Sequence, residues 1–301
     1  MKYLAVLAIL LLSCCFTFAQ TTRPIPQVDH VLIISIDGLR PDCLLRADAP
    51  VLHGLRRDGA SSLEALSVPA AVTLPAHVSM LTGVEPRKHG IEWNGEPPAG
   101  APAFPLVPTI FELAGRAGYR TALVAGKPKL AVLDRPGTVG LAVFPGGAAA
   151  TDAGVGAAAV KLIEERRPDL LFVHFPGADA AGHAAGWDSP EQLAAIAAID
   201  AHVGALLAAL ERTGLRPGTV VIVTADHGGE GRGHGAGSAA SARVPWLVAG
   251  PGVRAGLDLA RTGQPPVRLE DTAATACWLL GLGPPEYFDG RPVREAFAAG
   301  G

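Results

Sequence analysis

Continuous apolar runs rich in β-branched residues alternate along the chain with helical patterns. The runs are Val31–Ile36, Thr121–Ala125, Leu170–Phe175, Val220–Thr224 and Trp246–Ala249. Because they are apolar at nearly every position, they predict strands buried on both faces of a parallel sheet. The helical patterns are Pro108–Ala117, Gly154–Arg167, Glu191–Arg212 and Glu270–Leu280. This alternation predicts an α/β fold with a doubly wound, mostly parallel central sheet and helices on both faces.

Two stretches show neither a strand pattern nor a helical pattern. Residues 96–108 are rich in Pro and Gly, and residues 136–150 are rich in Gly and Ala. We expect both to be surface loops, and either could border a substrate pocket. Apolar strands continue on each side of them, so they do not resemble domain linkers. We therefore predict one catalytic domain over residues 20–301, a length that suits a single large core.

The N-terminus has the pattern of an export signal. Lys2 supplies a charged start, and Leu4–Leu12 is an apolar run of about nine residues, too short to span a bilayer. Small residues precede Gln20, so we predict a signal peptide over residues 1–19 and an exported protein, periplasmic or secreted, with no transmembrane span after cleavage. Lipid attachment at Cys14 is the alternative, because the preceding residues loosely resemble a lipobox.

Composition excludes some partners and leaves others open. Hydrophobic residues make up 49% of the chain and charged residues 18%, which is typical of a globular enzyme. The net charge of −3 offers no basic excess for a nucleic-acid duplex, whereas a small anionic substrate is compatible if metals supply positive charge. Cys43 and Cys277 could pair, but we expect buried thiols. Oligomeric state cannot be read from the sequence.

Acidic residues and histidines follow three of the predicted strands. Asp37 comes directly after the first run, Asp179 follows Leu170–Phe175 after a short Pro-Gly turn, and Asp226 and His227 follow Val220–Thr224. Ligands of open parallel sheets bind outside the carboxyl ends of the strands. One such residue would indicate an ordinary hydrogen-bonded strand end, but the set predicts a shared site.

The spacing within this set suits metal ligands. Asp179 and His183 are four positions apart, and Asp226 and His227 are consecutive, so that they could serve different metals or opposite sides of one. His234 lies between two glycines that allow a sharp bend. Imidazole nitrogen and carboxylate oxygen are ligands that zinc prefers, and there are enough of them for two sites.

Thr73 is the candidate nucleophile. The segment Leu74–Leu81 reads as a helix with Pro75 in its first turn, so Thr73 would lie at the helix N-terminus. Negative charge on an alkoxide or a phosphate is stabilised there. An N-cap threonine with only a structural role is the alternative, and this segment alone favours it.

The motifs together resemble the alkaline phosphatase superfamily, in particular its nucleotide pyrophosphatase/phosphodiesterase branch. The resemblance spans residues 31–235. It is carried by Ile36-Asp37-Gly38-Leu39-Arg40, Thr73-Leu74-Pro75-Ala76-His77, Thr82-Gly83 through His89-Gly90-Ile91, Asp179 with Gly182-His183, and Asp226-His227-Gly228.

The resemblance implies specific roles for these residues. Two divalent ions, preferentially zinc although manganese or iron could bind, would share seven ligands. The first site is implied to use Asp37, Thr73, Asp226 and His227, and the second Asp179, His183 and His234. Asn94 is implied to hold a phosphate oxygen. Thr73 would attack phosphorus and form a phospho-threonine intermediate that is then hydrolysed.

The sequence departs from the family at two places. Ala76 stands where the family usually has Asn, and His234 follows His227 more closely than the last ligand usually does. Lys127 and Lys129 follow another strand and could bind a substrate phosphate or carboxylate, as a similar Lys-x-Lys does in the related phosphonoacetate hydrolases, or could be solvated. Structural roles are expected for the remaining histidines, which are His30, His53, His77, His89, His174 and His202.

Several activities compete on these residues. A sulfatase needs Cys or Ser at the nucleophile position, and Thr73 does not supply that. A phosphonoacetate-type hydrolase and a phosphomonoesterase stay open, although Asn94 without an obvious second cationic clamp favours diesters or nucleotides. An exported zinc-binding protein is the non-enzyme alternative. Thr73 and Asn94 argue against it, because metal storage needs neither.

Overall fold

An eight-stranded mixed sheet runs through the centre of the computed structural model, which describes residues 23–298. Its order is β4-β3-β5-β1-β6-β7-β2-β8, and β7 alone runs antiparallel to its neighbours within it. The strands are β1 (His30–Ile36), β2 (Ala60–Leu66), β3 (Thr121–Ala125), β4 (Leu141–Val143), β5 (Leu170–Phe175), β6 (Thr219–Thr224), β7 (Arg243–Ala249) and β8 (Leu257–Asp258). The predicted signal peptide and Cys14 lie outside the described residues.

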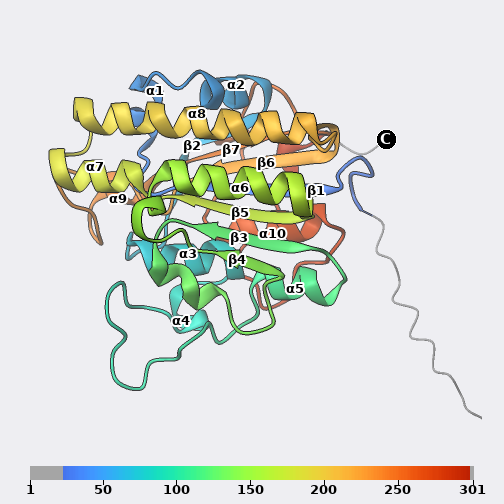
Figure 1. Ribbon diagram of the computed structural model, residues 1–301, viewed down its shortest axis with the longest axis horizontal. Helices are drawn as coiled ribbons and strands as arrows, with labels where there is room; N and C mark the ends of the chain where they lie inside the picture. The colour runs from blue at the N-terminus through green and yellow to red at the C-terminus, as the bar shows by residue number, and fades with distance from the viewer. Residues whose placement is uncertain (1–22, 299–301) are drawn as a thin grey trace, which may run out of the picture.

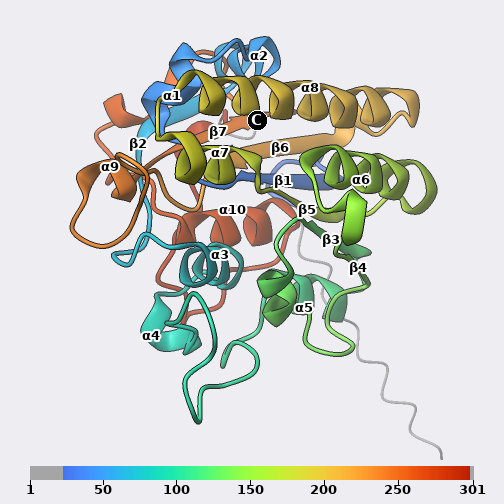
Figure 2. The same ribbon diagram turned by 60° about the vertical axis from the view of Figure 1, so that its left-hand side comes forward.

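Helices cover both faces of the sheet. Figures 1 and 2 show α2, α6 and α8 on one face and α3, α5 and α10 on the other. The helices are α1 (Pro41–Arg46), α2 (Pro50–Asp58), α3 (Thr73–Thr82), α4 (Pro86–His89), α5 (Ile110–Arg116), α6 (Asp152–Arg166), α7 (Gly177–Ala185), α8 (Pro190–Arg212), α9 (Ala239–Ala242) and α10 (Glu270–Leu279). The predicted α/β class with a mostly parallel sheet is confirmed.

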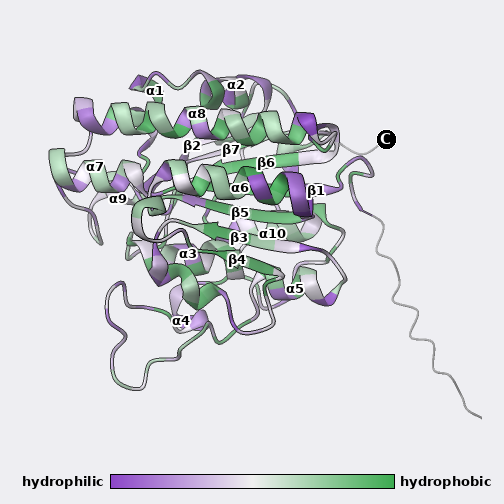
Figure 3. Cartoon of the chain, in the orientation of Figure 1, coloured by the Kyte–Doolittle hydropathy of each residue, from purple (hydrophilic) through white to green (hydrophobic). Residues whose placement is uncertain are grey.

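The five predicted strands all form, and they carry the core. The strands β3, β5 and β6 are buried along their whole length, and Figure 3 shows them as hydrophobic ribbons between helices with mixed surfaces. Burial on both faces is the reason for their continuous apolar pattern. The expectation that residues 136–150 form only a loop was wrong, because β4 pairs there with β3 at the edge of the sheet.

The long helix α8 packs against other helices that cover the same face of the sheet. Ser189 caps it by accepting a hydrogen bond from the Gln192 N–H, and Pro190 occupies its first position. By length and composition this helix is apolar enough to cross a membrane, a property that core helices of soluble proteins share. Its buried side chains include Ile196, Ile199, Val203 and Leu206, and it contacts α2, α6 and α7.

Both cysteines of the described chain are buried free thiols, as predicted. Cys43 lies on α1 and Cys277 on α10, which belong to layers on different faces of the sheet. Burial raises the pKa of the Cys43 thiol to about 11. These thiols are therefore protonated at neutral pH and unreactive.

Candidate active site

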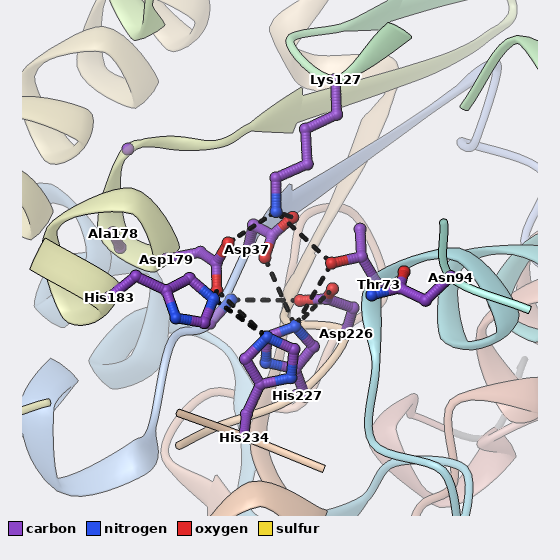
Figure 4. A network of polar contacts seen from close by, with 12 residues as sticks. Asp37, Thr73, Asn94, Lys127, Ala178, Asp179, His183, Asp226, His227 and His234 are labelled. Atoms are coloured by element: carbon purple, nitrogen blue, oxygen red, sulfur yellow. Dashed lines mark hydrogen bonds and ion pairs between the residues drawn. The ribbon is translucent and has the colours of Figure 1, made fainter. Parts of the chain in front are cut away.

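Four neighbouring parallel strands end at the same edge of the sheet, and each is followed by a charged side chain. The strands lie side by side in the order β3, β5, β1 and β6. Lys127 follows β3, Asp179 lies on α7 just after β5, Asp37 follows β1, and Asp226 and His227 follow β6. Figure 4 shows these side chains converging on one point, with Thr73 beside them.

One part of this cluster surrounds His227. Its Nε2 lies 3.5 Å from Oδ1 of Asp37, 3.2 Å from Oδ2 of Asp226 and 3.4 Å from Oγ1 of Thr73. All four side chains are essentially inaccessible to solvent. The consecutive residues Asp226 and His227 therefore point into the same space. The structure thus gathers the four residues that the resemblance assigns to the first metal site.

The other part of the cluster surrounds Asp179. One helical turn of α7 separates Asp179 from His183, and Oδ1 of Asp179 lies 3.3 Å from Nε2 of His183 and 3.6 Å from Nε2 of His234. The two imidazole Nε2 atoms are 3.2 Å apart. The His234 ring also stacks on the His227 ring, with centroids 3.6 Å apart, and so joins the two parts. His234 thus lies with Asp179 and His183 despite its unusual position in the sequence.

Histidine nitrogens and carboxylate oxygens of the cluster are free to bind a divalent metal ion. Nδ1 of each of the three histidines is hydrogen-bonded to a backbone carbonyl, of Arg232 for His183, Gly228 for His227 and Ala71 for His234. This fixes the tautomer with a free lone pair on Nε2, as in metal-binding histidines. The buried atoms Asp37 Oδ1, Asp179 Oδ1 and Asp226 Oδ2 have no hydrogen-bond donor.

The spacing of these atoms also fits metal ions. Ligands about 2.0 Å from a tetrahedral zinc ion lie roughly 3.3 Å from one another. The distances from His227 Nε2 to its three oxygen neighbours, and those among Asp179, His183 and His234, range from 3.2 to 3.6 Å. Asp179, His183 and His234 therefore suit a divalent ion, and so do Asp37, Asp179 and His227, whose ligand atoms all lie within 4.8 Å of one another. Buried carboxylate oxygens are left without a partner if none binds.

Thr73 is the first residue of α3, so its side chain stands at the positive end of the helix dipole. Ala71, two residues earlier, has a φ of 44°, a strained value for a residue with a side chain. The carbonyl of Ala71 accepts the hydrogen bond from His234. The turn before Thr73 therefore contacts the group formed by Asp179, His183 and His234.

Asn94 lies in the loop before α5 and is held against the start of α3. Its Oδ1 accepts hydrogen bonds from the Leu74 N–H at 2.9 Å and from Lys129 Nζ at 3.1 Å. Because both donors occupy the carbonyl oxygen, the amide NH₂ is the group left to donate to a substrate. The structure therefore brings Asn94 and Lys129 beside Thr73.

The carboxyl groups of Asp37 and Asp226 have pKa values shifted in opposite directions. Burial and the nearby Asp37 carboxylate raise the pKa of Asp226 to about 7. Burial opposes ionisation of Asp37 too, but Lys127 and the hydrogen bond from His174 hold the pKa of Asp37 well below its usual range. The two acids interact closely, so one ionised carboxylate makes ionisation of the other less favourable.

His174 touches this site, although the sequence indicated only a structural role for it. Its Nε2 donates to Oδ2 of Asp37 at 2.9 Å, and its ring meets the ring of His77 edge to face. His77 in turn bonds to the Thr73 carbonyl through Nδ1 and to Ser35 through Nε2. A polar residue near the end of the otherwise apolar run Leu170–Phe175 was the available signal.

Comparison with known proteins identifies the family of the chain. The family model "Type I phosphodiesterase / nucleotide pyrophosphatase" matches residues 31–96 and 132–231, more than half of the chain. An uncharacterized pyrophosphatase/phosphodiesterase of Schizosaccharomyces pombe is 26% identical over 220 residues, which cover 66% of this chain and 44% of that protein. The human ectonucleotide pyrophosphatase/phosphodiesterase family member 5 is 27% identical over 226 residues, covering 67% and 45% respectively.

The fold is shared with solved structures of this group. A murine ectonucleotide pyrophosphatase/phosphodiesterase 5, an inactive variant in complex with AMP, superposes with a TM-score of 0.75 at 18% identity and covers 90% of this chain and 100% of that one. The chain spans less than half the length of the two curated relatives named above. It belongs to the type I phosphodiesterase/nucleotide pyrophosphatase family, a branch of the alkaline phosphatase superfamily.

Proposed function

We propose that this protein is an exported, metal-dependent hydrolase of small phosphate esters, of the phosphodiester and nucleotide pyrophosphate type. The observation that carries the proposal is the position of Thr73. Its hydroxyl oxygen lies at a helix N-terminus, 3.4 Å from Nε2 of His227 and 3.3 Å from Nζ of Lys127, beside two sets of metal-type ligands. Family membership supports the same chemistry.

We assign the first metal site to Asp37, Thr73, Asp226 and His227 and the second to Asp179, His183 and His234, with zinc as the preferred ion. Two bound divalent ions would lower the pKa of the Thr73 hydroxyl and of an attacking water and would draw charge from the phosphoryl oxygens. The unpartnered oxygens of Asp37, Asp179 and Asp226 support this assignment.

The residues of this chain then perform a two-step displacement. The Thr73 hydroxyl releases its proton to solvent and its oxygen forms a bond to phosphorus, while the bond to the leaving oxygen breaks and that oxygen takes up a proton from solvent. The ammonium of Lys127, 3.3 Å away, stabilises the negative charge on the threonine oxygen. The Asn94 NH₂ donates to a phosphoryl oxygen. Water then attacks phosphorus, and the Thr73–phosphorus bond breaks, which restores the hydroxyl.

A phosphomonoesterase or phosphonate hydrolase is the second candidate, and one observation favours it. Lys127 and Lys129 both reach the site, the first beside Thr73 and the second on Asn94. Two cations suit a phosphoryl or phosphonoacetate group that carries more than one negative charge.

A panel of substrates tests the proposal. Nitrophenyl phosphomonoesters and phosphodiesters, a sulfate ester and phosphonoacetate would be offered to protein whose metal content has been measured, with Thr73→Ala as the control. We expect phosphodiester turnover that depends on metal and is lost in the variant. Preference for the monoester or the phosphonate would favour the second candidate. Protein that binds zinc but hydrolyses none of these would contradict an enzymatic role.

A further inference from the structure

Asp37 and Asp179 use their two carboxylate oxygens differently. Oδ1 of each faces histidine Nε2 atoms and has no hydrogen-bond donor. Oδ2 of each contacts Nζ of Lys127, at 2.7 Å for Asp37 and 2.6 Å for Asp179. One ammonium therefore bridges a carboxylate from each candidate metal site, and it approaches them from the side opposite the three histidines (Figure 4).

The charge balance of the cluster depends on this lysine. Three carboxylates, those of Asp37, Asp179 and Asp226, are buried within it. Among the residues that the structure describes, no other lysine or arginine forms an ion pair with any of them. The neighbouring Lys129 bonds to Asn94 instead. A buried cluster of like charges is strongly unfavourable without a counter-ion.

We propose that Lys127 is the built-in counter-ion of this cluster, and that its fixed charge weakens divalent-metal binding at both sites while stabilising the metal-free protein. The inference rests on the metal sites of the proposed function. An ammonium ion beside both ligand carboxylates repels a divalent ion that binds to their other oxygens. When metal is absent, the same ammonium offsets the repulsion among the carboxylates.

The test compares variants that remove this charge with one that removes the charge next to it. Lys127→Met removes charge and hydrogen bonding, Lys127→Gln keeps a hydrogen-bond donor, and Lys129→Met is the matched control. Zinc affinity would be measured by competition with a chromophoric chelator, and the unfolding temperature would be measured in metal-free protein.

We expect both Lys127 variants to bind zinc about tenfold or more tightly than wild type and to unfold at a lower temperature without metal. Lys129→Met should change both measurements far less, because the Lys129 ammonium bonds to Asn94 and not to the carboxylates. If a metal-free variant unfolds near room temperature, its affinity can be obtained from the zinc dependence of unfolding.

The test separates a failure of the counter-ion inference from a failure of the proposed metal sites. Equal or weaker zinc binding by the Lys127 variants, in a protein whose wild type binds zinc and hydrolyses esters, would overturn the counter-ion inference alone. Wild-type protein that binds no divalent ion would contradict the proposed metal sites, and the inference with them.

Discussion

The imidazole of His174 donates a hydrogen bond to Oδ2 of Asp37, and both side chains are fully buried. His174 lies opposite Ser35 in the parallel pairing of β5 with β1, so the register of the sheet sets its distance from Asp37. The bond turns Oδ1 of Asp37 toward His227. We therefore regard His174 as a positioning residue for Asp37, the proposed metal ligand.

Replacing His174 should weaken metal binding. Outer partners of metal ligands typically contribute about 10–100-fold to affinity, and we expect a loss in this range for His174→Gln. The matched control is His202→Gln, because His202 stacks on Phe175 without contacting Asp37. Chelator competition measures both variants. A His174 variant with wild-type affinity would show that the hydrogen bond serves packing alone.

Removing the Thr73 hydroxyl should abolish hydrolysis while leaving the fold intact. We expect kcat/KM of Thr73→Ala to fall by at least about a thousandfold, because no other described hydroxyl bonds to His227. Thr73→Ser, which keeps the oxygen, should retain measurable turnover. Thermal unfolding of all three proteins should confirm that they are folded. Substantial activity in Thr73→Ala would assign the attack to a different group, such as water.

Two changes at Asn94 separate its donor from its acceptor. Asn94→Asp keeps an oxygen for the Leu74 N–H and Lys129 but loses the NH₂ group, whereas Asn94→Ala loses both. A hydrogen bond to a charged group contributes about 1.5–3 kcal/mol, so we expect kcat/KM of Asn94→Ala to fall by roughly 10–100-fold. The Asp variant should be at least as impaired, yet more stable. If it were more active than Asn94→Ala, the NH₂ would not contact the substrate.

The stability of the metal-free protein should fall as pH drops below about 6.5. His89 is buried, and its Nε2 bonds to the Ser79 hydroxyl. Its Nδ1 accepts a hydrogen bond from the Ile91 N–H, so a proton added to Nδ1 would clash with that N–H. Burial lowers the pKa of His89 from 6.5 to about 4. The unfolded chain therefore binds a proton that the folded chain excludes, and stability present above pH 6.5 is lost toward pH 4.

This loss amounts to roughly 3 kcal/mol at most for one histidine. Urea denaturation at pH 7 and pH 4.5, with chelator present, measures it as a change in the free energy of unfolding. His89→Gln should be less stable at pH 7 but should lose less on acidification. An identical pH dependence in the variant would assign the effect to other groups, of which the buried His77 is the next to examine.

The sheet, and the residues that gather at its edge, could be predicted from the sequence because both leave local patterns. Strands buried on two faces are apolar throughout, and an aspartate (Asp37, Asp179 or Asp226) follows each of β1, β5 and β6 within a few positions. The strand β2 was missed because Ser61, Ser62 and Glu64 interrupt its apolar pattern. Its pairing with β7, distant in sequence, stabilises it instead.

The contacts that support the ligands could not be predicted in the same way. His174 reaches Asp37, and Lys127 reaches Asp179, only because β3, β5 and β1 lie side by side. Sequence separation says nothing about that order. The unusual position of His234 illustrates the same point, since a turn and the carbonyl of Ala71 bring it to Asp179.

The most direct measurement is the location of the phosphoryl group during turnover. Zinc-loaded protein would be mixed with a phosphodiester, quenched in acid within the first turnovers and mapped by peptide mass spectrometry, with Thr73→Ala treated in parallel. We predict phosphate on Thr73 in the wild type and none in the variant. Steady turnover with an unmodified Thr73, or phosphate on a different residue, would contradict the account.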